Sequence, residues 1–321
     1  MQLFRVRGIP VRIDFGWLLI VVFIAWTLAS GYFPHVLPSL SPTAYWIQGL
    51  TAALLLFASV LLHELAHALV AVRHGIPVGG ITLHIFGGVS QLDSEPETPR
   101  AELLIAIVGP LASFAIAGVA HGVGRLFSGP SWPDALAGYL GAVNVVVGVF
   151  NLVPAFPLDG GRVLRAALWA WTGRLVAATR IATRIGSALA LVMIAAGIVR
   201  AVTGDVVAGL WLALIGLFLQ QASRSSYALM HVRVRLAALP AEHVMNTAPA
   251  VLESMGPGIP GAEQAVSPRD SAWQAFLKIA RNGRGRVAVV DRGVLVGVIS
   301  QRDLQDVVTA ERDTRAAPRA A

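Results

Sequence analysis

The sequence contains no cysteine, and only 13% of its 321 residues carry a charge. The lack of cysteine excludes a disulfide framework and any metal site built from thiolates. The scarcity of charge accompanies 55% hydrophobic residues and a mean hydropathy of +0.67, which set the chain apart from an average soluble protein. The composition therefore predicts a membrane protein before any motif is considered.

Six segments are long and apolar enough to cross a bilayer as helices. They are approximately Phe15–Tyr32, Ala44–Val72, Leu103–Leu126, Leu136–Val153, Ile181–Val202 and Val206–Ala222. The first is too long to be a removable signal peptide and lacks a small-residue cleavage site, so we expect it to remain as a permanent span. The predicted fold is an α-helical polytopic membrane protein in a lipid bilayer.

Arginines are concentrated on one side of the predicted spans. Those on this side precede the first span or follow the second, fourth and sixth: Arg5, Arg7, Arg12, Arg73, Arg100, Arg162, Arg165, Arg174, Arg180, Arg184, Arg224, Arg233 and Arg235. The opposite side carries only Arg125 and Arg200. The positive-inside rule therefore predicts that both termini are cytoplasmic. The net charge of +7 reflects this topology and attraction to anionic lipid, and we expect no nucleic-acid partner.

The second predicted span contains the pattern HELAH at positions 63–67. Residues i and i+4 share one face of a helix, so His63 and His67 can bind one metal ion. Glu64 is then placed to take a proton from a metal-bound water, as in zinc metalloproteases. The alternative is a fortuitous histidine pair packed against polar neighbours. The membrane disfavours it, because ionisable side chains in hydrocarbon are costly unless they have a function.

The fourth predicted span ends in the sequence NLVPAFPLDGGR, residues 151–162. Its two prolines and two glycines interrupt a helix, which is tolerated at membrane depth where backbone is buried in protein or lines a wet cavity. Catalytic zinc commonly takes three protein ligands, and the predicted depth of Asp159 matches that of the histidine pair. Asp159 is therefore the predicted third ligand. The alternative is that it caps the next helix or pairs with Arg162 or Arg165.

His74 and His84 are rival ligands, because both follow closely in the sequence. His74 lies at a predicted helix end, where a solvated histidine commonly compensates the helix dipole. His84 lies in a strand-like alternating run, where it would form part of a polar face. His121, in the outer half of the third span, is expected to pack within the bundle.

These motifs together resemble the site-2 protease family of intramembrane zinc metalloproteases, especially the bacterial branch related to the sporulation protease that carries CBS domains. The matching segments are LFRVRGIPV (3–11), HELAH (63–67), FGGV (86–89), GPLAS (109–113) and the stretch from Phe150 to Gly161. Leu158 stands where many members have asparagine or proline. Gly109 and Pro110 have an alternative explanation in close helix packing around a tolerated kink.

The resemblance implies one zinc ion per chain, with His63, His67 and Asp159 as ligands and Glu64 as the general base. Asn151 corresponds to a family asparagine that helps to position the substrate or polarises its carbonyl. The resemblance also implies a location in the bacterial inner membrane and a membrane-protein substrate, for example a single-span regulatory protein. Only about 30 residues separate the second and third spans, so no PDZ-like insertion selects the substrate there.

The segment Ile81–Leu92 is predicted to form a β-hairpin after the second span. A helical substrate hides its carbonyls in hydrogen bonds and must unwind to be cut, and the edge of this hairpin could accept it as an added strand. Phe86, Gly87 and Gly88 are therefore predicted docking residues. The glycine pair can also be explained as a tight turn, and both explanations can hold together.

The composition of the chain changes after Ala222, from mostly apolar to basic and amphipathic. Residues 1–222 are the predicted protease domain, and 223–240 form a basic amphipathic linker helix along the inner interface. Residues 241–310 resemble a single CBS repeat, a small cytoplasmic α/β unit with a loop at 256–261, and 311–321 are expected to be disordered. The predicted elements of this repeat are helices at Ala272–Ala280 and Arg302–Thr309 and strands at Arg286–Val290 and Val294–Ile299.

The CBS resemblance implies that Ser300 and Asp303 contact the ribose of an adenine nucleotide. The alternative is structural, because Ser-x-x-Asp before a helix is also a capping box. CBS repeats normally work in pairs. Either two chains pair their single repeats in a homodimer, or the unit is a degenerate docking module.

Two classes of function account for these features. The first is a zinc endopeptidase that cleaves transmembrane segments in regulated intramembrane proteolysis, with activity modulated by the CBS domain. The alternative is a metal-ion or proton transporter with a CBS sensor, because intramembrane histidine and carboxylate residues also mark ion pathways. Transporters are expected to show internal repeats or paired broken helices, whereas only the fourth span is visibly broken here. The sequence therefore favours the protease.

Overall fold

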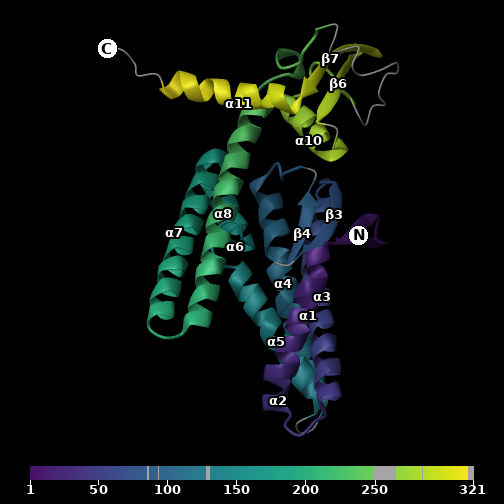
Figure 1. Cartoon of the computed structure of the whole chain (residues 1–321). Coiled ribbons are helices and arrows are strands. Elements are labelled where there is room, and N and C mark those ends of the chain that lie inside the picture. Colours follow the sequence, from purple (N-terminus) through teal and green to yellow (C-terminus); the bar gives the residue numbers. More distant parts are fainter. Residues whose placement is uncertain (85–86, 93, 128–130, 249–264, 284, 317–321) are drawn as a thin grey trace. The chain divides into compact units, whose positions relative to one another are not determined.

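The computed structural model of the chain describes residues 1–84, 87–92, 94–127, 131–248, 265–283 and 285–316 (Figure 1). The contacts divide the chain into two compact units, Met1–Ser226 and Tyr227–Ala321. The predicted docking residue Phe86, the predicted loop 256–261 and the last five residues lie outside the described part of the chain.

The amino-terminal unit contains a four-stranded sheet built from two hairpins. Its strands are β1 (Gln2–Val6), β2 (Ile9–Ile13), β3 (Val78–His84) and β4 (Gly87–Leu92), in the spatial order β1-β2-β3-β4. Each hairpin is antiparallel, whereas β2 and β3 run parallel. The first hairpin turns through Arg7 and Gly8, both with positive φ. The strand β4 is left at one edge of the sheet.

Six helical segments of the described chain are long and apolar enough to cross a membrane, which confirms the predicted architecture. The first span, Phe15–Val36, consists of α1 (Phe15–Thr27), the π-helical turn η1 (Leu28–Tyr32) and α2 (Phe33–Val36). The other five are α3 (Pro42–Arg73), α4 (Pro99–Gly124), α5 (Trp132–Asn151), α7 (Leu175–Val202) and α8 (Val206–Ala237). The short helix α6 (Asp159–Thr172) follows α5.

Local sequence signals fix where the long helices begin. The side chains of Ser41, Thr98 and Ser131 accept hydrogen bonds from backbone amides three residues further on, at 3.2, 3.2 and 3.4 Å. Each of these caps satisfies an amide that the first turn of a helix leaves unpaired. Pro42 and Pro99 follow two of the caps, where a missing amide costs nothing and the fixed φ suits a helix.

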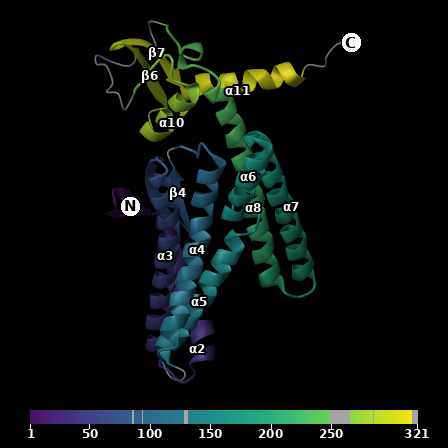
Figure 2. The same ribbon diagram turned by 180° about the vertical axis from the view of Figure 1, so that it is seen from behind.

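Small residues allow the helices to approach one another closely, as is common in membranes. A Cβ atom on Gly49 of α3 would collide with the carbonyl of Ala25 in α1. A Cβ atom on Gly197 of α7 would lie 2.6 Å from both the Gly209 carbonyl oxygen and the Ala213 nitrogen of α8. The helix α4 packs against α3, α5 and α6, and lies beside α3 and α5 in both views (Figures 1 and 2).

The predicted break after the fourth span is present. The helix α5 ends at Asn151 and α6 begins at Asp159, with residues 152–158 forming an irregular connection. This connection folds back onto the start of α6, so a Cβ atom on Gly160 would collide with the backbone of Leu152, and one on Gly161 with the backbone of Phe156. The two glycines therefore permit a close return of the chain that places Asp159 at a helix start.

The carboxyl-terminal unit is a small α/β fold. Its elements are the short 3₁₀ helix η2 (Ala241–His243), β5 (Ala265–Val266), α10 (Ala272–Asn282), β6 (Arg286–Asp291), β7 (Val294–Ser300) and α11 (Gln301–Ala316). The strand order is β5-β6-β7. Buried apolar residues from helices and strands form one core, among them Leu236, Val266, Ile279, Val287 and Ile299. The predicted helices and strands are all present, with slightly wider bounds.

Two features differ from the sequence prediction. Residues 223–237 do not form a separate linker helix, because α8 runs without interruption from Val206 to Ala237, and the boundary between the two units falls inside it. No glycine or proline lies between Gly216 and Pro240, so nothing in the sequence ends the helix there. The helix α11 also continues to Ala316, into the segment that we expected to be disordered.

Candidate metal centre

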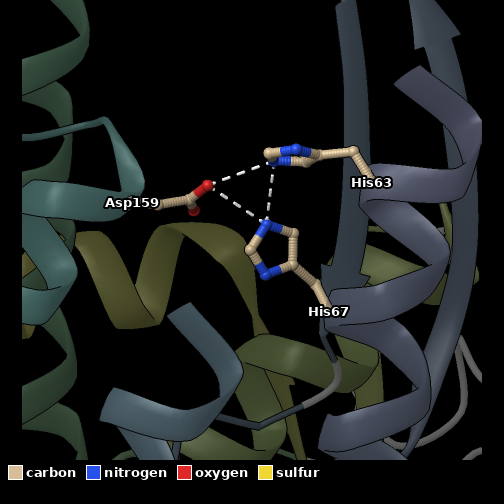
Figure 3. A group of neighbouring side chains, drawn as sticks. All are labelled: His63, His67 and Asp159. Atoms are coloured by element: carbon tan, nitrogen blue, oxygen red, sulfur yellow. Dashed lines mark hydrogen bonds and ion pairs between the residues drawn. The ribbon is translucent and has the colours of Figure 1, made fainter. Parts of the chain in front are cut away.

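Three predicted ligands converge in the amino-terminal unit. His63 and His67 stand one turn apart on α3, and both are buried, with exposed fractions of 4% and 5%. Asp159 is the first residue of α6. The two Nε2 atoms lie 3.1 Å apart, and each lies 3.2 Å from Asp159 Oδ2 (Figure 3). Among the described residues, these three make up the group that could hold a metal ion.

Contacts from α4 determine which nitrogen of each imidazole faces this group. His67 Nδ1 lies 2.6 Å from the carbonyl oxygen of Ile105. A carbonyl can only accept a hydrogen bond, so Nδ1 carries the proton, and in the neutral ring Nε2 offers a lone pair. His63 Nδ1 lies 2.9 Å from Ser113 Oγ, which leaves its Nε2 turned toward Asp159. Such partners fix the tautomer and the ring orientation of metal-binding histidines.

The donor set fits zinc. Histidine nitrogens and carboxylate oxygens bind zinc at about 2.0–2.2 Å, and at tetrahedral corners such atoms stand about 3.4 Å apart. The three donor atoms here are separated by 3.1–3.2 Å. Two imidazole nitrogens and a carboxylate are also the ligand types that zinc prefers, and three protein ligands leave a fourth position for water. The residues present can therefore hold a catalytic zinc ion.

Gly109 allows α4 to pass close to the two imidazoles. A Cβ atom at this position would collide with His67 Nε2 and would lie 2.6 Å from His63 Nε2. Close helix packing is the alternative explanation for Gly109 and Pro110 in the sequence. The approach is indeed close, but what Gly109 accommodates is the pair of histidine rings.

This contact gives a testable prediction for Gly109. The Gly109→Ala variant should bind zinc more weakly by about 10-fold or more, because the added methyl group displaces the two nitrogens that are predicted to bind the metal, and even indirect changes around a ligand cost 10- to 100-fold in affinity. Gly118→Ala is the matched control, since it lies on the same helix with open space around the added carbon. A competition titration against a chromophoric chelator measures the difference, and equal affinities of the two variants would contradict the prediction.

Glu64 lies beside the first histidine and is held by β4. The Ser90 hydroxyl lies 2.7 Å from Glu64 Oε2 and donates a hydrogen bond to it, and it also lies 3.2 Å from the Glu64 carbonyl oxygen. A Cβ atom on Gly88 would collide with the Glu64 side chain, so glycine at this position makes room for the carboxylate. Gly87 has a φ of +122°, as the tight-turn explanation requires. Docking of a substrate on this strand stays a prediction.

The other candidate residues are Asn151 and three further histidines. Asn151 is the half-buried last residue of α5, and its predicted contact with substrate stays a prediction. His74 is exposed at the carboxyl end of α3, and His121 is exposed near the end of α4. His84 ends β3. In the described structure none of these three histidines joins the group formed by His63, His67 and Asp159.

Neither alternative role of Asp159, as an arginine partner or as the cap of α6, is seen among the described residues. Arg165 pairs with Glu102, and its next acidic neighbour is Glu95, at 4.0 Å. The N-cap position of α6 is occupied by Leu158, and no side-chain hydrogen bond caps this helix. The Asp159 carboxylate instead faces the two imidazoles (Figure 3).

In the carboxyl-terminal unit, Ser300 and Asp303 bond to each other at the start of α11. Asp303 Oδ2 accepts hydrogen bonds from the Ser300 amide and hydroxyl, each at 2.7 Å, and the Ser300 hydroxyl accepts one from the Asp303 amide at 3.3 Å. This is the reciprocal pattern of a capping box. The structural explanation accounts for both side chains, and a nucleotide contact stays a prediction.

Comparison with known proteins finds one matching family model in each of the two units. The family model for Peptidase family M50 matches residues 51–139 and 130–193, and that for the CBS domain matches residues 241–310. The chain is 35% identical over 313 residues to Rip3 of Mycobacterium tuberculosis, which is named as a zinc metalloprotease, covering 97% of this chain and 76% of Rip3. It is 34% identical to sll0528 of Synechocystis, also named as a zinc metalloprotease, covering 95% and 77%.

Among solved structures, the Site-2 Protease from Methanocaldococcus jannaschii is 33% identical, with a TM-score of 0.47, covering 71% of this chain and 94% of that one. The long match to Rip3 spans both units of this chain, and the donor set of the metal centre suits the activity in the relatives' names. The findings favour the protease over the transporter. The chain belongs to peptidase family M50, the site-2 proteases, and is a multi-pass membrane zinc metalloendopeptidase with a CBS domain at its carboxyl end.

Proposed function

We propose that this protease cleaves the transmembrane segments of other membrane proteins, such as single-span regulators, in regulated intramembrane proteolysis. The observation that carries the proposal is the position of the histidine pair within an apolar helix. His63 and His67 lie in the carboxyl-terminal half of α3, an apolar helix of 32 residues that is long enough to span the bilayer. A water-soluble substrate would not reach such a site without leaving water, whereas a membrane-spanning substrate is already in the same medium.

In the proposed mechanism, His63, His67 and Asp159 hold one zinc ion. When bound, zinc polarises the peptide carbonyl and lowers the pKa of its water. Glu64, oriented by the Ser90 hydroxyl, accepts the proton from the attacking water as the new C–O bond forms, and returns it to the leaving nitrogen as the C–N bond breaks. Asn151 is proposed to orient the substrate carbonyl.

Substrate is proposed to dock in extended form along β4. This strand ends the order β1-β2-β3-β4, and Gly88 and Ser90 on it contact the side chain of Glu64. A substrate segment that added to this edge would lose its helical hydrogen bonds, pair with β4 instead, and lie next to the proposed base. The proposed docking residues Phe86, Gly87 and Gly88 would thus serve recognition beside the proposed base.

The topology, the domain division and the regulation of the protease are proposed from the charge pattern and the CBS domain. The arginine distribution supports cytoplasmic amino and carboxyl termini in a bacterial inner membrane. The proposed domains of the chain are a protease domain at 1–222, a linking segment at 223–240 and a CBS repeat at 241–310. This repeat is proposed to modulate cleavage, through adenine nucleotide at Ser300 and Asp303 or through pairing in a homodimer.

The proposal is tested by the position of the cut. Full-length protein and a tagged single-span substrate are reconstituted together in vesicles, and the mass of each product is measured. We expect cleavage within the membrane-spanning segment, and loss of cleavage when a zinc chelator is added. A cut confined to the water-exposed flanks, or equal cleavage of the same sequence as a free soluble peptide, would overturn the intramembrane assignment. A product of either kind would still be consistent with a metalloendopeptidase.

A further inference from the structure

A buried ion pair near the metal centre has no part in the mechanism described so far. Glu102, in the first turn of α4, is 1% exposed, and Arg165 of α6 is 6% exposed. Arg165 Nε donates to Glu102 Oε1 at 2.6 Å, and Arg165 Nη2 contacts the same oxygen. The two residues are 63 positions apart in the sequence, so their meeting is a product of the fold.

Stability alone does not account for this pair. Charged groups lose their hydration when buried, and a well-packed apolar pair of similar volume is often as stable or more stable. The cost of burying a charge is greater for Glu102, because it lies on a helix that is long and apolar enough to cross a membrane. A buried pair of this kind does, however, fix the relative position of the two elements that carry it.

The elements that carry it are those that bring the proposed ligands together. Arg165 lies six positions after Asp159 on α6, a helix of only 14 residues. The helix α4 carries Glu102 and also Ile105 and Ser113, the partners of the two imidazoles. The same helix therefore holds the histidines through two contacts and the aspartate helix through a third.

A second set of contacts holds the connection that leads to Asp159. The Arg165 guanidinium lies 5.0 Å from the centre of the Phe156 ring, a cation–π contact. The Phe156 carbonyl in turn accepts a hydrogen bond from the buried Ser223 hydroxyl of α8. Arg165 thus fixes both the helix that begins at Asp159 and the loop immediately before it.

We propose that Glu102 and Arg165 are positioning residues that hold Asp159 at the distance from His63 and His67 that zinc requires. This inference rests on the proposed role of Asp159 as a ligand. The pair touches neither substrate nor metal, and it acts through the placement of α6 against α4. Its removal should leave the chain folded while the third donor atom loses its fixed position.

The test is the double variant Glu102→Leu/Arg165→Met in full-length protein. Removing both charges together avoids leaving one of them buried and unpaired, so the variant is expected to fold. We expect its zinc affinity, measured by competition with a chelator, to fall by about 10- to 100-fold, as when the supporting contacts of other metal ligands are removed. In the metal-free protein, amide hydrogen exchange in residues 159–172 should become faster.

Arg165→Lys gives a second and milder variant. It keeps the charge but loses the planar fork of the guanidinium, so we expect a smaller loss of zinc affinity in the same direction. The matched control is Arg200→Gln/Asp205→Asn, which removes an exposed ion pair of 2.9 Å between the same kinds of group, away from the site. The control should bind zinc as the unmodified chain does.

The outcomes separate this inference from the ligand assignment. Unchanged zinc affinity in Glu102→Leu/Arg165→Met and Arg165→Lys, with unchanged exchange in α6, would overturn the positioning role. If Asp159→Asn binds zinc normally, the ligand assignment itself is wrong. Loss of zinc in Asp159→Asn without loss in the pair variants would overturn the positioning role alone.

Discussion

Replacing Glu64 with glutamine should abolish most of the cleavage while leaving zinc bound. Glutamine has nearly the same shape, so it can keep its packing against Gly88 and its hydrogen bond with Ser90. It cannot take a proton from water. General acid–base catalysis typically contributes 10²- to 10⁴-fold to a rate, so we expect the rate of cleavage to fall by about that factor. Single-turnover measurements on reconstituted protein give the rate, and elemental analysis gives the zinc content.

Glu97→Gln is the matched control for this experiment. Glu97 is an exposed glutamate in the segment before α4, and its substitution makes the same chemical change away from the metal centre. The control should retain both zinc and cleavage. Normal cleavage by Glu64→Gln would show that another group supplies the proton transfer. Loss of zinc from Glu64→Gln would show that the carboxylate also holds the metal.

The sequence was sufficient to predict that His63, His67 and Asp159 come together, and to predict the six spans, and the reason is local. The spacing of His63 and His67 places both on one helix face whatever the rest of the chain does. The prolines and glycines around Asp159 interrupt the helix on steric grounds that need no tertiary contact. Helical spans in a bilayer likewise follow from length and composition.

The contacts that orient the site could not be predicted in the same way. Ile105 acts through its backbone carbonyl, which every residue possesses, so its sequence carries no signal. Ser113 and Glu102 meet their partners across 50 and 63 positions, and a single sequence does not reveal such pairings. Gly109 did carry a signal, since glycine beside proline in a helix indicates close approach, but what approaches it depends on the fold.

The linker illustrates a different difficulty. The change from apolar to basic residues after Ala222 suggested a new element, whereas α8 continues through it to Ala237. Composition reports the medium that surrounds a helix, and a helix can pass from one medium into another without a break. Helix ends are set by breaking and capping residues, and here the next breaker is Pro240. The change of composition therefore marks a boundary of environment within one helix.

The second large effect is expected for Asp159→Asn, which should lose most of its zinc. The neutral amide keeps the shape of the carboxylate but lacks the charge that offsets the metal. Substitutions that only touch the supporting contacts of a ligand already cost 10- to 100-fold in affinity, so replacing a ligand should cost more than about 100-fold. The affinity is measured on full-length protein by competition with a chelator, alongside a thermal unfolding curve.

This substitution also discriminates between the two explanations of Asp159. Asparagine begins a helix about as well as aspartate does, so a residue that merely caps α6 should tolerate the change with zinc and stability intact. Asp14→Asn is the control, because Asp14 is an exposed aspartate at the start of another helix, α1. If Asp159 is a zinc ligand, Asp159→Asn should lose zinc while Asp14→Asn keeps it. If Asp159 only caps α6, both variants should keep zinc. Since the carboxylate lies 3.2 Å from both imidazole nitrogens, we expect the two variants to differ sharply.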